Sequence, residues 1–159
     1  MMLTKGQKFA DRAAISSSLG GSTQYGITRS SKFSVILLFM NDDELYNDYF
    51  YPKGKRDKCL YTGIGRIGNQ DNVTDNKSYY LNLDVLSSGN TKTPLLLFEK
   101  QKSGYHFVGE YKLIETHQNI QPDDNQKMRR VFVFHLERVE SDLFDISPYT
   151  KKYENTASV

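Results

Sequence analysis

The sequence predicts a mainly β domain with one or two short helices, an α+β fold whose strands form a curved β-barrel. Two observations favour this class. Runs of apolar, β-branched and aromatic residues of strand length recur along the chain, and only one segment has the pattern of an amphipathic helix. The 159 residues fit one domain. Several strands with few helices are typical of a closed or strongly bent sheet.

The N-terminal half contains the predicted helix. We expect it to begin near Lys5 and to stop at Gly20-Gly21, because glycine adopts the left-handed conformation of a helix end without steric cost. Residues 31–40 form an almost continuous apolar run, which predicts a buried strand. A turn over 52–55 then leads into a short strand over 58–62.

The C-terminal half contains most of the other predicted strands. Residues 68–80 are polar and turn-prone, and we expect a long loop there, of a length that usually serves a function. Three strands are expected over 94–100, 105–115 and 130–138. A loop over 118–126 separates the last two. Because the apolar signal fades from residue 140, the domain is expected to span 1–139, and 140–159 to be a tail or linker.

The composition argues against several classes of protein. A charged fraction of 25% and an apolar fraction of 38% are those of a water-soluble globule. The longest apolar run, over 35–40, is too short to cross a membrane, and no signal peptide precedes it, so we expect a cytoplasmic protein. Cys59 is the single cysteine, which excludes an intrachain disulfide and thiolate zinc sites. With three scattered histidines, we expect neither a metal nor a cofactor.

Charge is unevenly distributed along the chain. The net charge is +2, yet residues 41–50 hold four acids and no base, whereas 51–66 hold five bases and one acid. A concentrated basic stretch in a chain of modest net charge favours contact with phosphates on one face. A solvated loop without function is an equally good interpretation of the charge alone.

The glycine motif Gly63-Ile-Gly-Arg-Ile-Gly68 matches the dinucleotide-binding pattern G-x-G-x-x-G. That site also needs a helix to begin at the glycines, and the next residues are poor helix formers. We therefore expect the glycines to allow a sharp turn or a close approach.

No catalytic motif is convincing. Asp123-Asp124 with Gln126 and Lys127 distantly resembles a nuclease element, but the segment is turn-like. We therefore predict a binding module and not an enzyme.

Several motifs occur in an order that resembles the SRA (SET-and-RING-associated, or YDG) domain family. They are Gly6-Gln-Lys-Phe9-Ala-Asp-Arg12, Gly26-Ile27, Tyr46-Asn-Asp48, Tyr61-Thr-Gly-Ile-Gly65, Asn82-Leu83, Pro94-Leu-Leu-Leu-Phe98, Tyr105-His-Phe-Val-Gly109-Glu-Tyr111 and Arg129-Arg-Val-Phe-Val-Phe-His-Leu136. The resemblance covers about residues 5–139. It implies a PUA-like curved barrel that binds duplex DNA and flips a modified cytosine, 5-methylcytosine or 5-hydroxymethylcytosine, into a pocket. Bacterial members supply target recognition to modification-dependent restriction systems, so a nuclease domain or subunit is an expected partner, and a homodimer would be in keeping with restriction proteins.

The resemblance also implies roles for individual residues. Tyr46 and Tyr61 match the aromatic pair that stacks on the flipped base, and Asp48 matches the acid that accepts a hydrogen bond from the exocyclic amine of cytosine. Thr62 would add a polar contact. The spacing from Asp48 to Tyr61 is longer than in well-known members, and Asp57 is therefore an alternative acid.

Two further groups of residues are expected at the DNA. Candidates for phosphate contacts are Lys53, Lys55, Arg56 and Arg66, with Arg29 and Lys32 as weaker ones. The loop over 68–80 lies where related domains send a finger toward the gap left by the flipped base. Asn69, Gln70 and Asn72 could pair there with the orphaned guanine, although a solvated loop is an equal alternative.

A different class of function is also consistent with the sequence. A PUA-like or EVE-like module would bind RNA, or serve as a protein-interaction domain, with the same barrel and basic face but no flipping pocket. Recognition of another DNA modification, such as phosphorothioate, is a further alternative.

Overall fold

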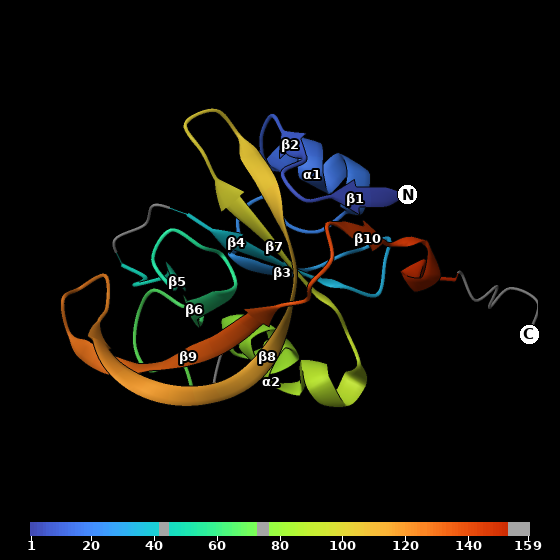
Figure 1. The fold of residues 1–159 in the computed structure, drawn as a ribbon. Helices are drawn as coiled ribbons and strands as arrows, with labels where there is room; N and C mark the ends of the chain where they lie inside the picture. The colour runs from blue at the N-terminus through green and yellow to red at the C-terminus, as the bar shows by residue number, and fades with distance from the viewer. Residues whose placement is uncertain (42–44, 73–76, 153–159) are drawn as a thin grey trace, which may run out of the picture.

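The computed structural model describes residues 1–41, 45–72 and 77–152. Figure 1 shows a strongly bent sheet with a helix on either side and a small second sheet near the N-terminus. In chain order the elements are β1 (Met2–Thr4), β2 (Lys8–Phe9), α1 (Arg12–Leu19), β3 (Ile27–Arg29), β4 (Ile36–Met40), β5 (Tyr49–Tyr51), β6 (Lys58–Thr62), α2 (Lys77–Thr91), β7 (Leu95–Lys100), β8 (Tyr105–Pro122), β9 (Met128–Arg138), β10 (Leu143–Asp145) and the 3-10 helix η1 (Ser147–Tyr149). The predicted mainly β class is confirmed.

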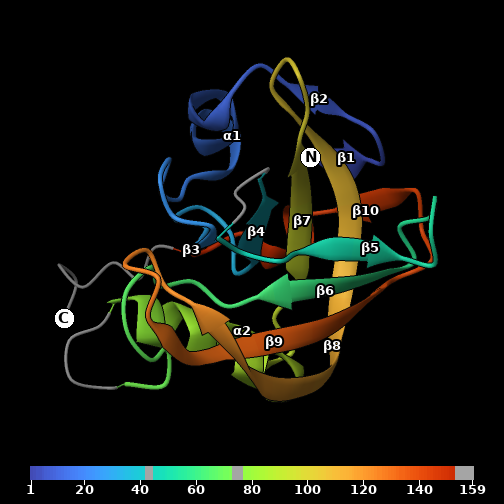
Figure 2. The ribbon, with the colours of Figure 1, turned by 90° about the vertical axis from the view of Figure 1, so that its left-hand side faces the viewer.

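The main sheet has the strand order β3-β4-β7-β8-β9-β6-β5, with β2 paired to the start of β8. The pair β4–β7 is parallel and the other pairs are antiparallel. Figure 2 shows β8 and β9 as long ribbons that bend across the sheet. Within the described residues the end strands β3 and β5 do not pair with each other, so the sheet is curved but is not closed into the expected barrel.

Two hydrophobic clusters lie on opposite faces of the central strands. Along β4, Leu38 belongs to the cluster that α2 covers, and Leu37 belongs to the one that α1 covers. Alternate residues of a strand point to opposite faces, so a strand covered on both sides must be apolar throughout. This is the physical reason for the unbroken apolar run that predicts a buried strand here.

Both helices differ from the sequence prediction. α1 begins at Arg12 rather than near Lys5, because the Asp11 carboxylate caps it by accepting the amide of Ala14 at 2.8 Å. It ends at Gly20, as expected, with a φ of 77°. α2 occupies part of the expected 68–80 loop and the segment after it. Its serines, asparagines and glycine are poor helix formers, and burial of its apolar side stabilises it instead.

The prediction of a loop over 118–126 is also wrong for most of these residues. β8 continues to Pro122, β9 begins at Met128, and the two form a long hairpin with only a short turn. The polar, solvent-exposed residues of this hairpin lack the apolar alternation on which the strand prediction depends.

The boundary expected at 139 lies too early. β10 pairs with β1, and Phe144 and Ile146 are buried among residues of the α1-side cluster. The packed chain therefore continues through η1, and residues 153–159 of the predicted tail lie outside the described part. Among the helices described, none has the length and apolar character needed to span a membrane.

Candidate nucleic-acid interface

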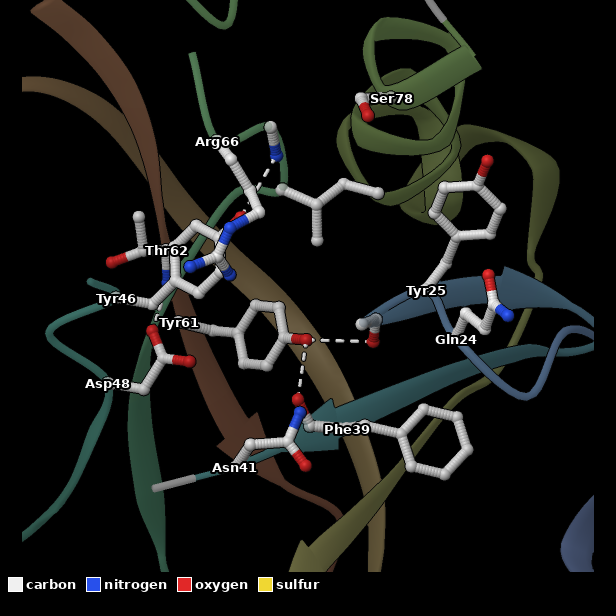
Figure 3. A pocket seen from close by; sticks show the side chains of 13 residues that line it. Gln24, Tyr25, Phe39, Asn41, Tyr46, Asp48, Tyr61, Thr62, Arg66 and Ser78 are labelled. Carbon is white, nitrogen blue, oxygen red and sulfur yellow. Dashed lines mark hydrogen bonds between the residues drawn. The ribbon is translucent and has the colours of Figure 1, made fainter. Parts of the chain in front are cut away.

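A cavity of about 350 Å³ opens where the β5–β6 hairpin meets the end of β4. All four residues predicted to hold a flipped base, Tyr46, Asp48, Tyr61 and Thr62, line it. They come from two segments, one directly before β5 and one at the end of β6, and the antiparallel pairing of these strands brings them together. Figure 3 shows Tyr61 in the middle of the site, with Tyr46 and Asp48 on one side.

The carboxylate of Asp48 is fixed by the neighbouring strand. Its Oδ1 accepts the backbone amide of Thr62 at 2.6 Å, just past the last β5–β6 pair, Tyr49 with Leu60. A charge-assisted bond of this length holds the side chain firmly. The acid is thereby positioned at the cavity wall by the sheet itself.

Tyr61 forms the inner wall of the cavity. Its side chain is only 1% exposed, and its hydroxyl lies 2.9 Å from both the Gly26 and the Phe39 carbonyl oxygens. Burial raises the pKa of Tyr61 well above its usual value, so the phenol stays neutral and donates to these carbonyls. Its position is set by the core as well as by the site.

Tyr46 forms a more open wall. Its hydroxyl accepts the Gly65 amide at 3.3 Å, and the guanidinium of Arg66 lies 5.9 Å from the centre of its ring. The side chain is half-buried, unlike that of Tyr61. A tyrosine ring held in this way offers an aromatic surface to a ligand in the cavity.

The opposite wall contains residues that sequence analysis did not single out. Gln24, Tyr25 and Ser78 line the cavity there, and Asn41 lines it beside Phe39, below Tyr61 (Figure 3). The motif Gly26-Ile27, adjacent to Tyr25, was the available signal, but it does not reveal which side chains face the site.

Arg12 holds the backbone of the segment that contains Tyr25 in place. Its Nη2 donates to the carbonyls of Ser22 and Tyr25 at 2.8 and 2.7 Å, and its guanidinium lies 3.4 Å from the centre of the Phe39 ring. The motif that ends at Arg12 therefore contributes to the cavity by holding the loop that contains Tyr25.

The alternative acid, Asp57, does not reach the cavity. It lies in the turn between β5 and β6, at the opposite end of the hairpin, and its Oδ1 lies 4.0 Å from Nη2 of Arg138. Because Tyr51 pairs with Lys58 at that end and Thr62 stands at the cavity, about 13 Å of strand separates the two ends. Asp57 as the base-binding acid is therefore wrong.

The basic turn lies at the same distant end. Lys53 and Lys55 are exposed there, while Arg56 forms a salt bridge with Glu99 at 2.9 Å and its carbonyl accepts the hydroxyl of Tyr111. These residues do not border the cavity. Their contact with phosphates stays a prediction for a more distant part of the DNA.

The other predicted phosphate contacts make bonds within the protein. Arg66 borders the cavity and forms a two-point salt bridge with Asp124 at 2.6 and 2.9 Å. Arg29 forms a similar pair with Asp84 at 2.5 and 2.8 Å. Lys32 donates to the Ser17 carbonyl at 2.6 Å. Of these three, only Arg66 lies beside the predicted base site.

Gln70 does not belong to a finger. Its side chain is 4% exposed, its Nε2 donates to the Gly63 carbonyl at 2.5 Å, and its Oε1 accepts the Phe132 amide at 2.9 Å. Asn69 is also engaged, since its Oδ1 accepts the amide of Arg130. Asn72 is exposed, and residues 73–76 of the expected finger lie outside the described residues.

The glycine motif has a structural role in this region. A Cβ on Gly63 would lie 2.7 Å from Gln70 Oε1 and 2.8 Å from Asn82 Oδ1, so only glycine allows these two amides to approach. Gly65 and Gly68 have φ values of 122° and 74°, which other residues rarely adopt. In the described part of the chain, no three His, Cys, Asp or Glu side chains gather in a way that could hold a metal ion.

Solved structures share this fold. The chain superimposes on the sulfur-binding and SRA domains of ScoMcrA complexed with phosphorothioated DNA with a TM-score of 0.69 at 23% identity, covering 87% of this chain and 40% of that one. The SRA domain of SUVH5 with hemi-methylated CG DNA matches with a TM-score of 0.63 at 23% identity, covering 88% and 91%. The DNA modification-dependent restriction endonuclease AspBHI matches with a TM-score of 0.68 at 14% identity, covering 92% and 44%.

The chain thus spans less than half the length of ScoMcrA and AspBHI. Comparison with curated proteins found no match. The family model of the ScoMcrA-like SRA domain matches residues 5–154, nearly the whole chain and slightly more than the sequence motifs covered. This protein belongs to the ScoMcrA-like SRA domain family.

Proposed function

We propose that this SRA domain binds duplex DNA that contains a modified cytosine and takes the flipped base into the cavity between Tyr46 and Tyr61. The observation that carries the proposal is the convergence of two aromatic rings, a fixed carboxylate and Thr62 on one cavity. A volume of about 350 Å³ lies within the range of small-ligand sites.

Such a cavity compensates for what the base loses when it leaves the duplex. Flipping costs a few kcal/mol of stacking and pairing. Stacking on an aromatic ring returns about 1–3 kcal/mol per base. Asp48 accepts a hydrogen bond from the exocyclic amine of cytosine, a donor that thymine lacks. The anchored carboxylate therefore provides discrimination, and the more open ring of Tyr46 provides affinity.

Structures of related folds support a modified base as the ligand. SUVH5 SRA domains have been solved with methylated and with hydroxymethylated DNA. AspBHI and TagI are modification-dependent restriction endonucleases. By analogy, this chain serves as the reader, and cleavage belongs to a nuclease domain or subunit.

A second candidate ligand is phosphorothioated DNA. It is favoured by the ScoMcrA structure, in which a sulfur-binding domain and an SRA domain occur with that DNA. A phosphorothioate lies on the DNA backbone, whereas the cavity here offers ring faces and a carboxylate, which suit a neutral base with an amine donor. The cavity therefore favours modified cytosine for this domain.

A binding experiment separates the two ligands. Dissociation constants would be measured for matched duplexes that are unmodified, 5-methylated, 5-hydroxymethylated or phosphorothioated. Tyr46→Ala should weaken binding of the preferred cytosine-modified duplex by about 5- to 150-fold, the equivalent of one lost stacking interaction. Asp48→Asn should reduce discrimination while it keeps an acceptor for the Thr62 amide.

Tyr49→Ala is the matched control, since Tyr49 is an exposed neighbour that does not line the cavity. Equal affinity of the wild-type protein for modified and unmodified cytosine would refute the proposal. Preference for the phosphorothioate duplex, unaffected by Tyr46→Ala, would support the second candidate.

A further inference from the structure

A second hollow lies beside the cavity, between β3 and the first turns of α2. We call it the β3–α2 groove; its volume is about 670 Å³. Its lining includes Tyr25, Thr28, Arg29, Lys77 and Tyr80.

The groove adjoins the proposed base site. Tyr25 lines both hollows, and α2 contributes Ser78 to the cavity and Lys77 and Tyr80 to the groove. In Figure 3 the Tyr25 ring stands on the side of the cavity away from Tyr46 and extends toward α2. A strand whose base enters the cavity would therefore pass Tyr25 to reach the groove.

The chemistry of the groove matches a nucleotide. Tyr25 and Tyr80 are 37% and 56% exposed, which leaves ring surface available for stacking. The Lys77 ammonium lies 4.9 Å from the centre of the Tyr25 ring. None of the described residues that line the groove is acidic.

Arg29 also lines the groove, but its guanidinium is already paired with a carboxylate. Asp84 holds its guanidinium through Nε and Nη2, so most of its charge is compensated and its position is set. Lys77 is consequently the cation best suited to meet a phosphate here, and Tyr80 is the most exposed aromatic surface beside it.

We propose that the β3–α2 groove binds the nucleotide next to the flipped base, with Lys77 at its phosphate and Tyr80 against its sugar or base. This inference rests on the proposed function, because it places the groove on the same DNA strand as the cavity. It assigns to α2 a role in binding the DNA strand beside the flipped base. This role is separate from recognition of the modification.

The test measures affinity for the modified duplex as a function of salt. Neutralising one phosphate contributes about −0.9 to the slope of log K against log [salt], so Lys77→Ala should make the slope shallower by about that amount. Tyr80→Ala should weaken binding about 5-fold or more, and Tyr80→Phe should not, because the ring is retained. Lys102→Ala, in the turn between β7 and β8, is the control and should leave the groove intact.

Placement on the strand is tested with uncharged methylphosphonates, introduced one at a time beside the modified cytosine. At one flanking position the substitution should remove the effect of Lys77→Ala, since the two changes then delete the same interaction. The ratio of affinities for modified and unmodified DNA should stay as in the wild type.

The outcomes separate this inference from the proposed function. If the wild type discriminates modified DNA but neither Lys77→Ala nor Tyr80→Ala changes slope or affinity, the groove inference alone is overturned. If the wild type does not discriminate, the proposed function fails, and with it the position given to the groove. An effect of Lys77→Ala that no single methylphosphonate removes would likewise overturn the assignment to the neighbouring nucleotide.

Discussion

Tyr61 serves the site and the core at once. Its ring packs in the cluster under α2 and also faces the cavity, and its hydroxyl joins the Gly26 and Phe39 backbone. Replacement by alanine would leave a hole in the core, so a loss of binding in that variant would not identify a stacking role. Tyr46, which is half-buried, is the better residue for a binding test.

Removing only the hydroxyl of Tyr61 is therefore informative. Tyr61→Phe leaves two buried carbonyls without this donor and should lower the free energy of unfolding by roughly 1–3 kcal/mol. Because the ring remains, affinity for modified DNA should fall much less than in Tyr46→Ala. Urea denaturation and a binding titration on the same sample check both effects. Unchanged stability would mean that the hydroxyl does not anchor the end of the β3–β4 pair at Gly26 and Phe39.

The β8–β9 hairpin and the glycine motif act as one element. Arg129 donates to the Gly68 carbonyl at 2.8 Å, and Arg130 forms a salt bridge with Asp71 at 3.0 Å. Gln70 completes the connection from the inside by linking Gly63 to Phe132. The cavity wall at Gly65 and Arg66 thus depends on the hairpin that lies next to it.

Gln70→Ala tests this dependence. It leaves a buried carbonyl and a buried amide without partners and should destabilise the protein by roughly 1–3 kcal/mol. Since the wall beside Tyr46 loses its support, affinity for modified DNA should also decrease. Thermal unfolding and binding of Asn119→Ala, an exposed hairpin variant, give the comparison. If Gln70→Ala folds and binds as the control does, the proposed connection is wrong.

At this scale the sequence predicts strands better than helices. Residues 36–40 and 95–98 are apolar because both of their faces are covered, and this pattern is local and visible. α2 has no comparable signal: its residues favour other conformations, and tertiary burial of Leu81 and Val85 decides its structure. The four pocket residues could be chosen from motifs, whereas Tyr25 and Ser78 meet them only through the fold.

For the molecule as a whole, β1 and β10 close the fold by joining its two ends. Leu3 pairs with Phe144, and both are buried against the cluster that contains Phe98. This contact joins residues near the two ends of the described chain. Removal of either end segment therefore exposes the buried side chains of the other.

Truncation measures how much the pairing of β1 with β10 contributes to the free energy of unfolding. A chain that ends at Val139 loses the buried Phe144 and Ile146 and should be less stable by several kcal/mol, at about 1.5–3 kcal/mol for each large apolar side chain. A chain that ends at Lys152 keeps all the described contacts and is the comparison. Equal melting temperatures for the two truncations would show that 140–150 is a tail after all.

The location of the 52–57 turn has a consequence for how relatives of this protein are recognised. The turn separates Asp48 from Tyr61 along the chain but lies at the far end of the β5–β6 ladder, so lengthening or shortening it leaves the two side chains at the same rung. Residue spacing between them can therefore drift freely during evolution while the geometry stays constant. A sequence profile that permits a variable gap between the acid and the second tyrosine should recover divergent homologues that a rigid pattern would overlook.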